Sequence, residues 1–265
     1  MNDLPTPPAG PRISLADEAK THSEDPFFQK CADQFAELQQ AICTEVERAD
    51  GAATFVIDNW ERPHGGDGGP ILGGHGSTRI LEGGRVFERA GVGFSLVFGR
   101  FTDEFAARLP VGTGNLFAAT GVSLVFHPRS PHLPTVHMNC RRLSRGGAGW
   151  FGGGADLTPY YVNEDDARHF HQTLADSCDR HPEIADYPAM KRACDRYFFN
   201  HHRGECRGIG GTFFDYLTDE KHPRDDVFAF VADTGKALID AYFPIVARHK
   251  DRLWTEEERR WQLIR

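Results

Sequence analysis

Apolar residues recur at three- and four-residue spacing from Phe27 to Val46, which is the period of one buried face of an α-helix. Asp25 stands where a capping side chain is expected. Pro26 takes the first helical position, where the N–H that proline lacks would have no partner. The preceding residues, 1–24, are polar and rich in proline, so we expect them to form a mobile tail.

Between Ala52 and Asp156 the pattern changes to short β-branched and aromatic runs separated by glycine. The runs are TFVIDNW, TRILEG, RVFERAGVGFSLVFG, NLFAATGVSLVFH, TVHMNCRRL and GWFGGGADL. Consecutive runs joined by turns predict an antiparallel meander, and the lack of alternating strands and helices disfavours a doubly wound nucleotide fold. The glycine- and histidine-rich segment 64–84 lacks the GxxxxGK[ST] pattern of a phosphate loop, so we expect a flexible loop or lid there.

A helical period returns after these runs. It predicts helices over 163–178 and 188–202, and a third over 225–248 that breaks near Pro244. Helices at both ends of the chain with strands between them predict an α+β fold. We expect a large antiparallel β-sheet flanked on both sides by α-helices, in a single domain over 25–265.

The charge and the cysteines narrow the class of protein. The formal net charge is −8, so no excess of basic residues is available to replace phosphate counterions, which argues against a general nucleic-acid binder. The six cysteines follow no CxxC, CxxxCxxC or zinc-ribbon spacing, so we expect reduced, buried thiols and no iron–sulfur cluster. No apolar run approaches the ~20 residues of a membrane span, and the polar start lacks the apolar region of a signal peptide. These features predict a cytoplasmic protein.

Candidate chemistry is concentrated on two strands. Because side chains alternate between the two faces of a strand, TVHMNCR divides into two sets. One set is apolar and suits a core: Val136, Met138 and Cys140. The other is a hydrogen-bonding and cationic row: His137, Asn139 and Arg141. The preceding run, GVSLVFH, places Ser123 and His127 on one face in the same way, and a short connection puts the two polar rows beside each other. A half-solvated sheet would also alternate, but this row is richer than solvation requires.

Histidines and arginines supply the remaining candidates. Four imidazoles, with Asp156, could in principle offer ligands to a divalent metal: His127, His137, His171 and His202. His171 lies on the buried stripe of the helix 163–178, whereas His169 points away from it. Without an HExxH motif or another close chelating pair, spacing alone favours structural histidines over metal ligands. Four arginines are available to pair with substrate carboxylates: Arg129, Arg141, Arg203 and Arg207.

Four long motifs of mixed chemistry follow one another: HPRSPHLPTVHMNCR, WFGGGADLTPYY, RHFHQTL and RYFFNHHRGECRGIGGTFFDYL. In order and spacing they resemble the oxygen-dependent coproporphyrinogen III oxidases, and the resemblance extends from about Phe27 to the C-terminus. It implies an oxidoreductase of haem biosynthesis that oxidatively decarboxylates the ring A and B propionates of coproporphyrinogen III to vinyl groups. The product would be protoporphyrinogen IX, with O2 as the electron acceptor and no flavin, haem or nicotinamide.

The resemblance also implies roles for particular residues. His137 matches the family's proton donor, and Asp156 matches an aspartate proposed to act on a pyrrole N–H. Substrate binding is implied for four residues: Ser123, Asn139, Cys140 and Arg141. A divalent cation of unspecified identity is implied for four histidines: His127, His137, His171 and His202. Because Arg141 shares a strand face with His137, we expect it to pair with a propionate rather than with a structural carboxylate.

The resemblance further implies a homodimer. Family members continue past RRWQLIR with a further strand and a glycine-rich segment that serve substrate binding and dimerisation, whereas this chain ends at Arg265. Two alternative functions remain open. One is a metal-dependent hydrolase or oxygenase that uses the histidines around Asp156. The other is a non-catalytic porphyrin-binding protein.

Overall fold

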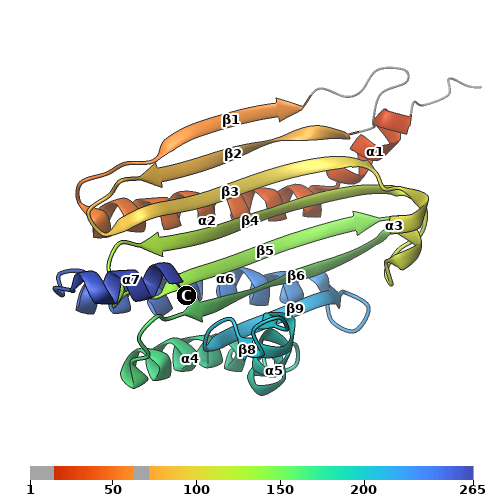
Figure 1. The fold of residues 1–265 in the computed structure, drawn as a ribbon. Helices are drawn as coiled ribbons and strands as arrows, with labels where there is room; N and C mark the ends of the chain where they lie inside the picture. Colours follow the sequence, from red (N-terminus) through yellow and green to blue (C-terminus); the bar gives the residue numbers. More distant parts are fainter. Residues whose placement is uncertain (1–14, 63–71, 265) are drawn as a thin grey trace, which may run out of the picture.

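The computed structural model describes residues 15–62 and 72–264 (Figure 1). Within these residues seven strands form one antiparallel sheet in the order β1–β2–β3–β4–β5–β6–β9. The strands are β1 (Val56–Arg62), β2 (Leu72–Glu82), β3 (Phe87–Arg100), β4 (Leu116–Pro128), β5 (Thr135–Arg145), β6 (Ala148–Thr158) and β9 (Gly210–Thr218). A separate ribbon pairs β7 (Phe199–Asn200) with β8 (Glu205–Cys206). The predicted meander is confirmed, because β1 to β6 each pair with the next strand in the sequence.

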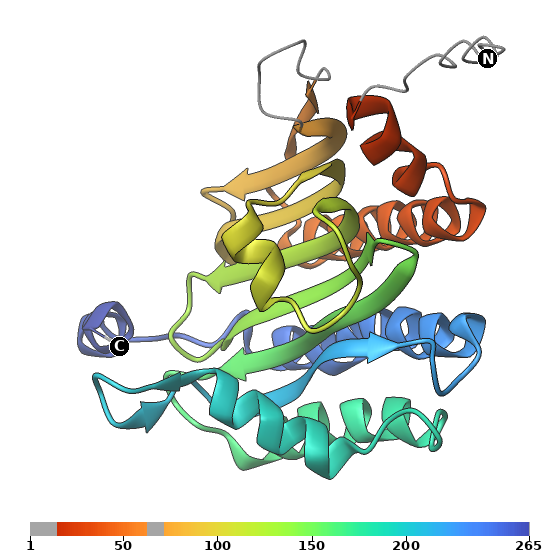
Figure 2. The ribbon, with the colours of Figure 1, turned by 90° about the vertical axis from the view of Figure 1, so that its right-hand side faces the viewer.

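The helices cover the sheet unevenly. They are α1 (Leu15–Ser23), α2 (Pro26–Asp50), α3 (Asp103–Arg108), α4 (Glu164–Asp179), α5 (Tyr187–Tyr197), α6 (Arg224–His249) and α7 (Glu256–Ile264). The two long helices, α2 and α6, lie side by side against one face of the sheet (Figures 1 and 2). The main core lies between them and the strands, and it includes Phe35, Val122, Met138 and Phe230. The predicted α+β class is therefore confirmed.

The start of α2 follows the sequence prediction. The Asp25 carboxylate accepts a hydrogen bond from the Phe27 N–H at 2.8 Å, and Pro26 takes the first helical position. The predicted tail is partly wrong, because residues 15–23 form α1. Ala19 of α1 is buried in a small cluster with Phe28, which explains how a short, polar segment is held as a helix. Residues 1–14 of the predicted tail lie outside the described residues.

Two other predicted segments differ from the structure. The segment 64–84, expected to be a loop or lid, is strand β2 from Leu72 onward, and 64–71 lies outside the described residues. The helix expected over 188–202 ends at Tyr197, and the chain then enters the β7–β8 ribbon. Strand β9 is absent from the predicted strands because its sequence, GGTFFDYLT, begins with two glycines and lacks a clean alternation.

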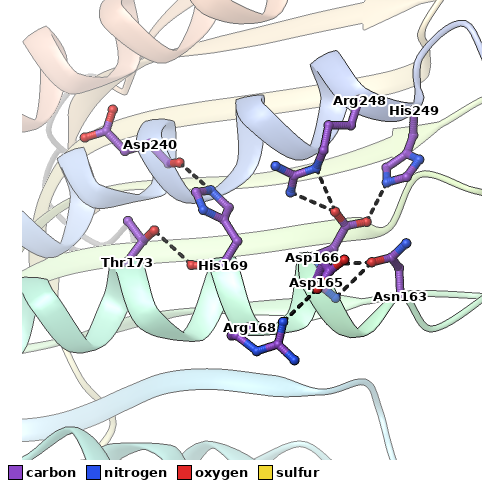
Figure 3. A network of polar contacts seen from close by, with 9 residues as sticks. All are labelled: Asn163, Asp165, Asp166, Arg168, His169, Thr173, Asp240, Arg248 and His249. Atoms are coloured by element: carbon purple, nitrogen blue, oxygen red, sulfur yellow. Dashed lines mark hydrogen bonds and ion pairs between the residues drawn. The ribbon is translucent and has the colours of Figure 1, made fainter.

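Helix α6 does not break at Pro244, contrary to the prediction. A proline cannot donate to the carbonyl four residues earlier, which here belongs to Asp240. That carbonyl instead lies 3.0 Å from Nε2 of His169 on α4 (Figure 3). Since a carbonyl only accepts, His169 must carry its proton on Nε2. A side chain of the neighbouring helix therefore satisfies the acceptor that Pro244 leaves unpaired, and the helix continues.

Candidate active site

A cavity of about 270 Å³ lies on the sheet face opposite α2 and α6. Its polar lining comes from β4, β5, β9 and the segment before β9: Ser123, His137, Asn139, Arg141, Arg207 and Thr212. Its aromatic wall comes from the end of α5 and from β9: Tyr197, Phe198 and Phe213. The Tyr197 and Phe213 rings stack at 4.1 Å between centroids. The cavity thus combines a flat apolar wall with hydrogen-bonding groups and two cations.

The strand register explains why the polar side chains meet. Ser123 on β4 stands opposite Asn139 on β5, and His137 stands opposite Asp156 on β6. On the opposite face of β5, Val136, Met138 and Cys140 are fully buried. The two polar rows that the sequence predicted therefore do lie beside each other. Ser123, His137, Asn139 and Arg141 all line the cavity.

His137 is held by a buried carboxylate. Its Nδ1 lies 2.9 Å from Oδ1 of Asp156, a residue that is only 2% exposed. An ionised carboxylate only accepts hydrogen bonds, so Nδ1 carries a proton and Nε2 is the basic nitrogen of the neutral ring. The Phe198 ring packs edge-on against the imidazole, with 5.7 Å between centroids. The ring of His137 is thereby fixed in both tautomer and orientation.

Arg207 completes this arrangement. Its Nη2 donates to both Asp156 oxygens, at 2.6 and 2.7 Å, and its Nε donates to Oδ2 at 3.1 Å. The guanidinium also stacks on Phe198, with its Cζ 3.7 Å from the ring centroid. A bidentate arginine beside a carboxylate is a strong, directional pair. Two residues predicted for direct substrate contact are thus bonded to each other.

Asp156 therefore lies behind His137 rather than at the cavity surface. The resemblance implied that this aspartate acts on a pyrrole N–H. In the structure both of its oxygens are occupied by Arg207, one also by His137, and the side chain is 3% exposed. The sequence could not show this, because the covering arginine comes from a segment 51 residues further along the chain. Asp156 is therefore connected to the cavity through two side chains that line it, His137 and Arg207.

Arg141 is paired in a way that differs from the expectation. Its Nη2 lies 2.8 Å from Oδ2 of Asp215 on β9, and its Nη1 donates to Oδ1 of Asn139 at 2.7 Å. The expected partner was a propionate rather than a structural carboxylate. Two other predicted arginines have partners outside the cavity: Arg129 donates to the Gly84 carbonyl, and Arg203 pairs with Glu205 at 3.4 Å.

Cys140 faces the wrong way for side-chain contact with a ligand in this cavity. It is 0% exposed, and its Sγ lies 3.7 Å from the Val231 carbonyl of α6. Burial raises the pKa of its thiol to about 12, so it is protonated. The prediction of free, buried thiols is confirmed for five residues: Cys31, Cys43, Cys140, Cys178 and Cys194. The sixth cysteine, Cys206 of β8, is exposed.

The four histidines predicted as metal ligands are not brought together. His127 lines a separate cavity with Arg89 and Arg259, and the Nδ1 of His171 bonds the Tyr187 hydroxyl at 2.6 Å. His202 is exposed between β7 and β8. No group of three or more His, Cys, Asp or Glu side chains is arranged for a metal ion within the part of the chain that the structure describes. These residues do not fit a shared cation site. The cavity that His137 lines includes none of the other three: His127, His171 and His202.

A second cavity, of about 410 Å³, continues the first along the sheet toward β1. The two share three lining residues: Ser123, Asn139 and Arg141. Its floor consists of small residues on β3 and β4, Gly93, Ser95, Ala119 and Gly121, and Trp60 of β1 also lines it. We call the two cavities together the groove. Its two connected cavities and small-residue floor leave room above the sheet for an extended ligand.

Sequence comparisons show which family the chain that forms this groove belongs to. A sequence model of the family described as coproporphyrinogen III oxidase matches residues 30–265. The human oxygen-dependent coproporphyrinogen-III oxidase, mitochondrial, is 43% identical over 243 residues, which cover 86% of this chain and 51% of that protein. The mouse protein of the same name is 43% identical over 244 residues, covering 86% and 52%. The chain thus spans about half the length of these curated relatives. It belongs to the coproporphyrinogen III oxidase family.

Proposed function

We propose that this chain oxidatively decarboxylates the ring A and B propionates of coproporphyrinogen III to vinyl groups, giving protoporphyrinogen IX in haem biosynthesis. In each step a propionate loses CO2 and the equivalent of a hydride. O2 accepts the two electrons and, with one further proton, leaves as H2O2. The proposal is carried by one observation, a histidine fixed by a buried aspartate in a groove that also holds an arginine. The names of the two relatives support the substrate and the oxidant.

The groove suits such a substrate in shape and charge. Coproporphyrinogen III carries four pyrrole rings and four propionates. The Tyr197–Phe213 stack offers the rings an aromatic wall, and Ser123 and Asn139 offer hydrogen bonds. Arg141 offers a guanidinium, whose fork is well matched to a carboxylate. Binding at these groups would orient the macrocycle before it reacts with oxygen, which is the main contribution we assign to the protein.

Proton handling falls to His137. The Nε2 atom of its neutral ring is the basic nitrogen, because Nδ1–H is bound to Asp156. Histidine is the side chain used most often for proton transfer near neutral pH. The Asp156 carboxylate stabilises the imidazolium that forms when Nε2 accepts a proton, while Arg207 fixes the position of Asp156. We therefore assign proton transfer to His137 and positioning to Asp156 and Arg207.

We derive no step through a metal, because the four predicted ligands do not converge. The homodimer and the cytoplasmic location are proposals that rest on the family resemblance and the sequence, and light scattering would test the dimer. The human and mouse relatives are named as mitochondrial. Among the helices of the described residues, none is long and apolar enough to cross a membrane.

An oxygen-controlled assay tests the function. Purified protein is incubated with coproporphyrinogen III in air and under argon, and products are read by fluorescence after chemical oxidation. We expect protoporphyrin only in air, with oxygen uptake and CO2 release. Binding of the porphyrinogen without oxygen uptake would contradict the proposal and favour a porphyrin-binding protein. Complete loss of activity on chelation, with stoichiometric metal in the protein, would favour a metal-dependent enzyme.

A further inference from the structure

The β6–β9 pairing contains a bulge next to the groove. The register passes from Phe151–Leu217 to Gly153–Phe214, so Asp215 and Tyr216 both stand opposite Gly152. Tyr216 adopts φ +52°, a backbone conformation that non-glycine residues rarely take. Bulges of this kind redirect side chains and are common beside functional sites. Here Asp215 points toward Arg141, while the Tyr216 ring stacks on Trp150.

The bulge creates a clamp on the Arg141 guanidinium. Asp215 holds Nη2 at 2.8 Å and Asn139 holds Nη1 at 2.7 Å. The space for the ion pair depends on Gly152. A Cβ at that position would lie 2.5 Å from both Arg141 Nη2 and Asp215 Oδ1. The pair is partly open to solvent, since the side chains of Arg141 and Asp215 are 32% and 27% exposed.

The clamped guanidinium stands where the two cavities of the groove meet. Arg141 and Asn139 line both cavities. An arginine has five N–H donors, and the two contacts of the clamp engage only part of them. The others can still donate to a ligand carboxylate. The position suits an anchor for an acidic group of a ligand that extends into both cavities.

We propose that Asp215 is a positioning residue that fixes the Arg141 guanidinium for binding a substrate carboxylate. This rests on the proposed function, which supplies a substrate with propionates. A free arginine side chain loses much rotamer entropy when it binds, and a clamped one has already lost it. The negative charge of Asp215 opposes this gain by repelling the ligand carboxylate. Water and salt around this partly exposed pair weaken the repulsion between Asp215 and the ligand carboxylate. In the free energy of binding, the entropy saved by pre-ordering the guanidinium therefore outweighs that repulsion.

A double-mutant cycle tests the proposal with coproporphyrin III, the stable oxidised tetracarboxylate, as the fluorescent probe. Binding is measured for the wild type, Asp215→Ala, Arg141→Ala and the double variant. We expect Asp215→Ala to weaken binding about five- to twenty-fold, as for contacting residues that are coupled. In the Arg141→Ala background the same change should have an effect of less than about two-fold, because the residue it positions is gone.

Turnover of coproporphyrinogen III gives a second readout. Asp215→Ala should raise KM and leave kcat within about two-fold, since Asp215 acts on binding through Arg141. Asp215→Asn keeps the size and one acceptor oxygen, so it should fold and show an intermediate KM. Gly152→Ala keeps both charges but displaces the pair, so it should weaken porphyrin binding in the same direction.

A matched control is Asp233→Ala on α6. Asp233 is also partly exposed, at 33%, and pairs with Arg180 and with His181 at 2.9 Å, away from the groove. Its loss should leave porphyrin binding unchanged.

Additive effects of the two substitutions in the cycle would overturn the proposal. Tighter binding by Asp215→Ala would also overturn it, because it would show that Asp215 competes with the substrate for Arg141. A wild type that neither binds nor oxidises the tetrapyrrole would overturn the proposed function and this inference together. An active wild type with an unchanged Asp215→Ala would overturn only the positioning role.

Discussion

Two aspartates with little exposure are held by similar partners in different parts of the molecule. Asp156 on β6 accepts from Arg207 and from His137. Asp166 in the first turn of α4 accepts from Arg248 Nη2 at 2.7 Å and Nε at 3.0 Å. Nε2 of His249 lies 2.7 Å from its other oxygen (Figure 3). Each group therefore consists of one aspartate, one arginine and one histidine.

Their surroundings differ. The imidazole of His137 lines the groove, whereas the side chain of His249 is 13% exposed and lies between the end of α6 and the start of α4. In the second group the carboxylate stands at a helix N-terminus and the Arg248 guanidinium at a helix C-terminus, where the helix dipoles favour a negative and a positive charge respectively. The same three residue types thus border a groove in one place and join two helices in the other. Composition alone does not distinguish these roles.

The largest effect is expected on kcat, when the histidine of the Asp156 group is replaced and compared with the histidine of the Asp166 group. His137→Ala should lower kcat by about 10²- to 10⁴-fold, the range for loss of a general acid or base. Its melting temperature should stay within about 2 °C, because the side chain borders a cavity. The matched variant His249→Ala should do the reverse, with lower stability and an unchanged kcat. Steady-state kinetics and thermal unfolding of both variants provide the check, and a loss of kcat in His249→Ala would contradict the comparison.

The next effect concerns stability. Asp166→Ala should lower the free energy of unfolding by about 2–3 kcal/mol, because it leaves the Arg248 guanidinium, and the His249 imidazole beside it, without their carboxylate. The value lies below the range for fully buried pairs, since the Arg248 side chain is 44% exposed and can be hydrated. Denaturant unfolding measures this, with Asp165→Ala as the control. The Asp165 side chain is 85% exposed beside Arg168, and its loss should change stability by less than about 0.5 kcal/mol. Equal effects of the two variants would be evidence against a structural role for Asp166.

A pH series extends the comparison to histidines packed away from the groove. Burial lowers the pKa of His132 and of His171 below the ordinary value of 6.5, and nearby Arg252 and Lys191 lower them further. The unfolded chain therefore binds more protons as the pH falls. The stability from these two groups is complete above pH 6.5 and is lost as the pH falls through the lowered values. We therefore expect the melting temperature to fall as the pH is lowered below about 6.5. His132→Gln, which cannot titrate, should show a shallower drop, and an identical slope would contradict the assignment.

The smallest effect is expected at His169. His169→Ala should cost at most about 1 kcal/mol, because Asp240 is exposed and water can replace the lost donor to its carbonyl. kcat should not change, because His169 contacts α6 and does not line the groove. His169→Gln, which keeps an N–H donor, should recover part of the loss. Chemical denaturation of the wild type, His169→Ala and His169→Gln measures the effect on stability. A lowered kcat in His169→Ala would contradict a purely structural role for His169.

The sequence predicted those features that depend on local pattern. Alternation along GVSLVFH and TVHMNCR was sufficient to place Ser123, His137, Asn139 and Arg141 on one face, and the capping signal at Asp25 located the start of α2. These inferences need only the two-residue period of a strand and the chemistry of a helix start. The same local reasoning identified six of the seven strands in the large sheet of the described chain.

Features that depend on distant partners were not predictable in this way. The role of Arg207 depends on Asp156, from which it is separated by two helices and a ribbon. The clamp of Asp215 depends on a bulge, which shifts side-chain parity at a position that no periodicity indicates. The family resemblance, and not the spacing of residues, implied a cation site shared by His171 and His137. Its actual partner is the Tyr187 hydroxyl of α5. Signals for such contacts lie in the packing of elements and not in any one segment.

The contact between His169 and the Asp240 carbonyl has a consequence for which sequence changes can be accepted together. The hydrogen bond matters only because Pro244 provides no N–H for that carbonyl. In a chain with alanine at position 244, the ordinary helical hydrogen bond would form and His169 would no longer be needed as a donor. The two positions are therefore epistatic. Loss of the histidine is harmful beside proline and neutral beside alanine, so a lineage would replace Pro244 before His169.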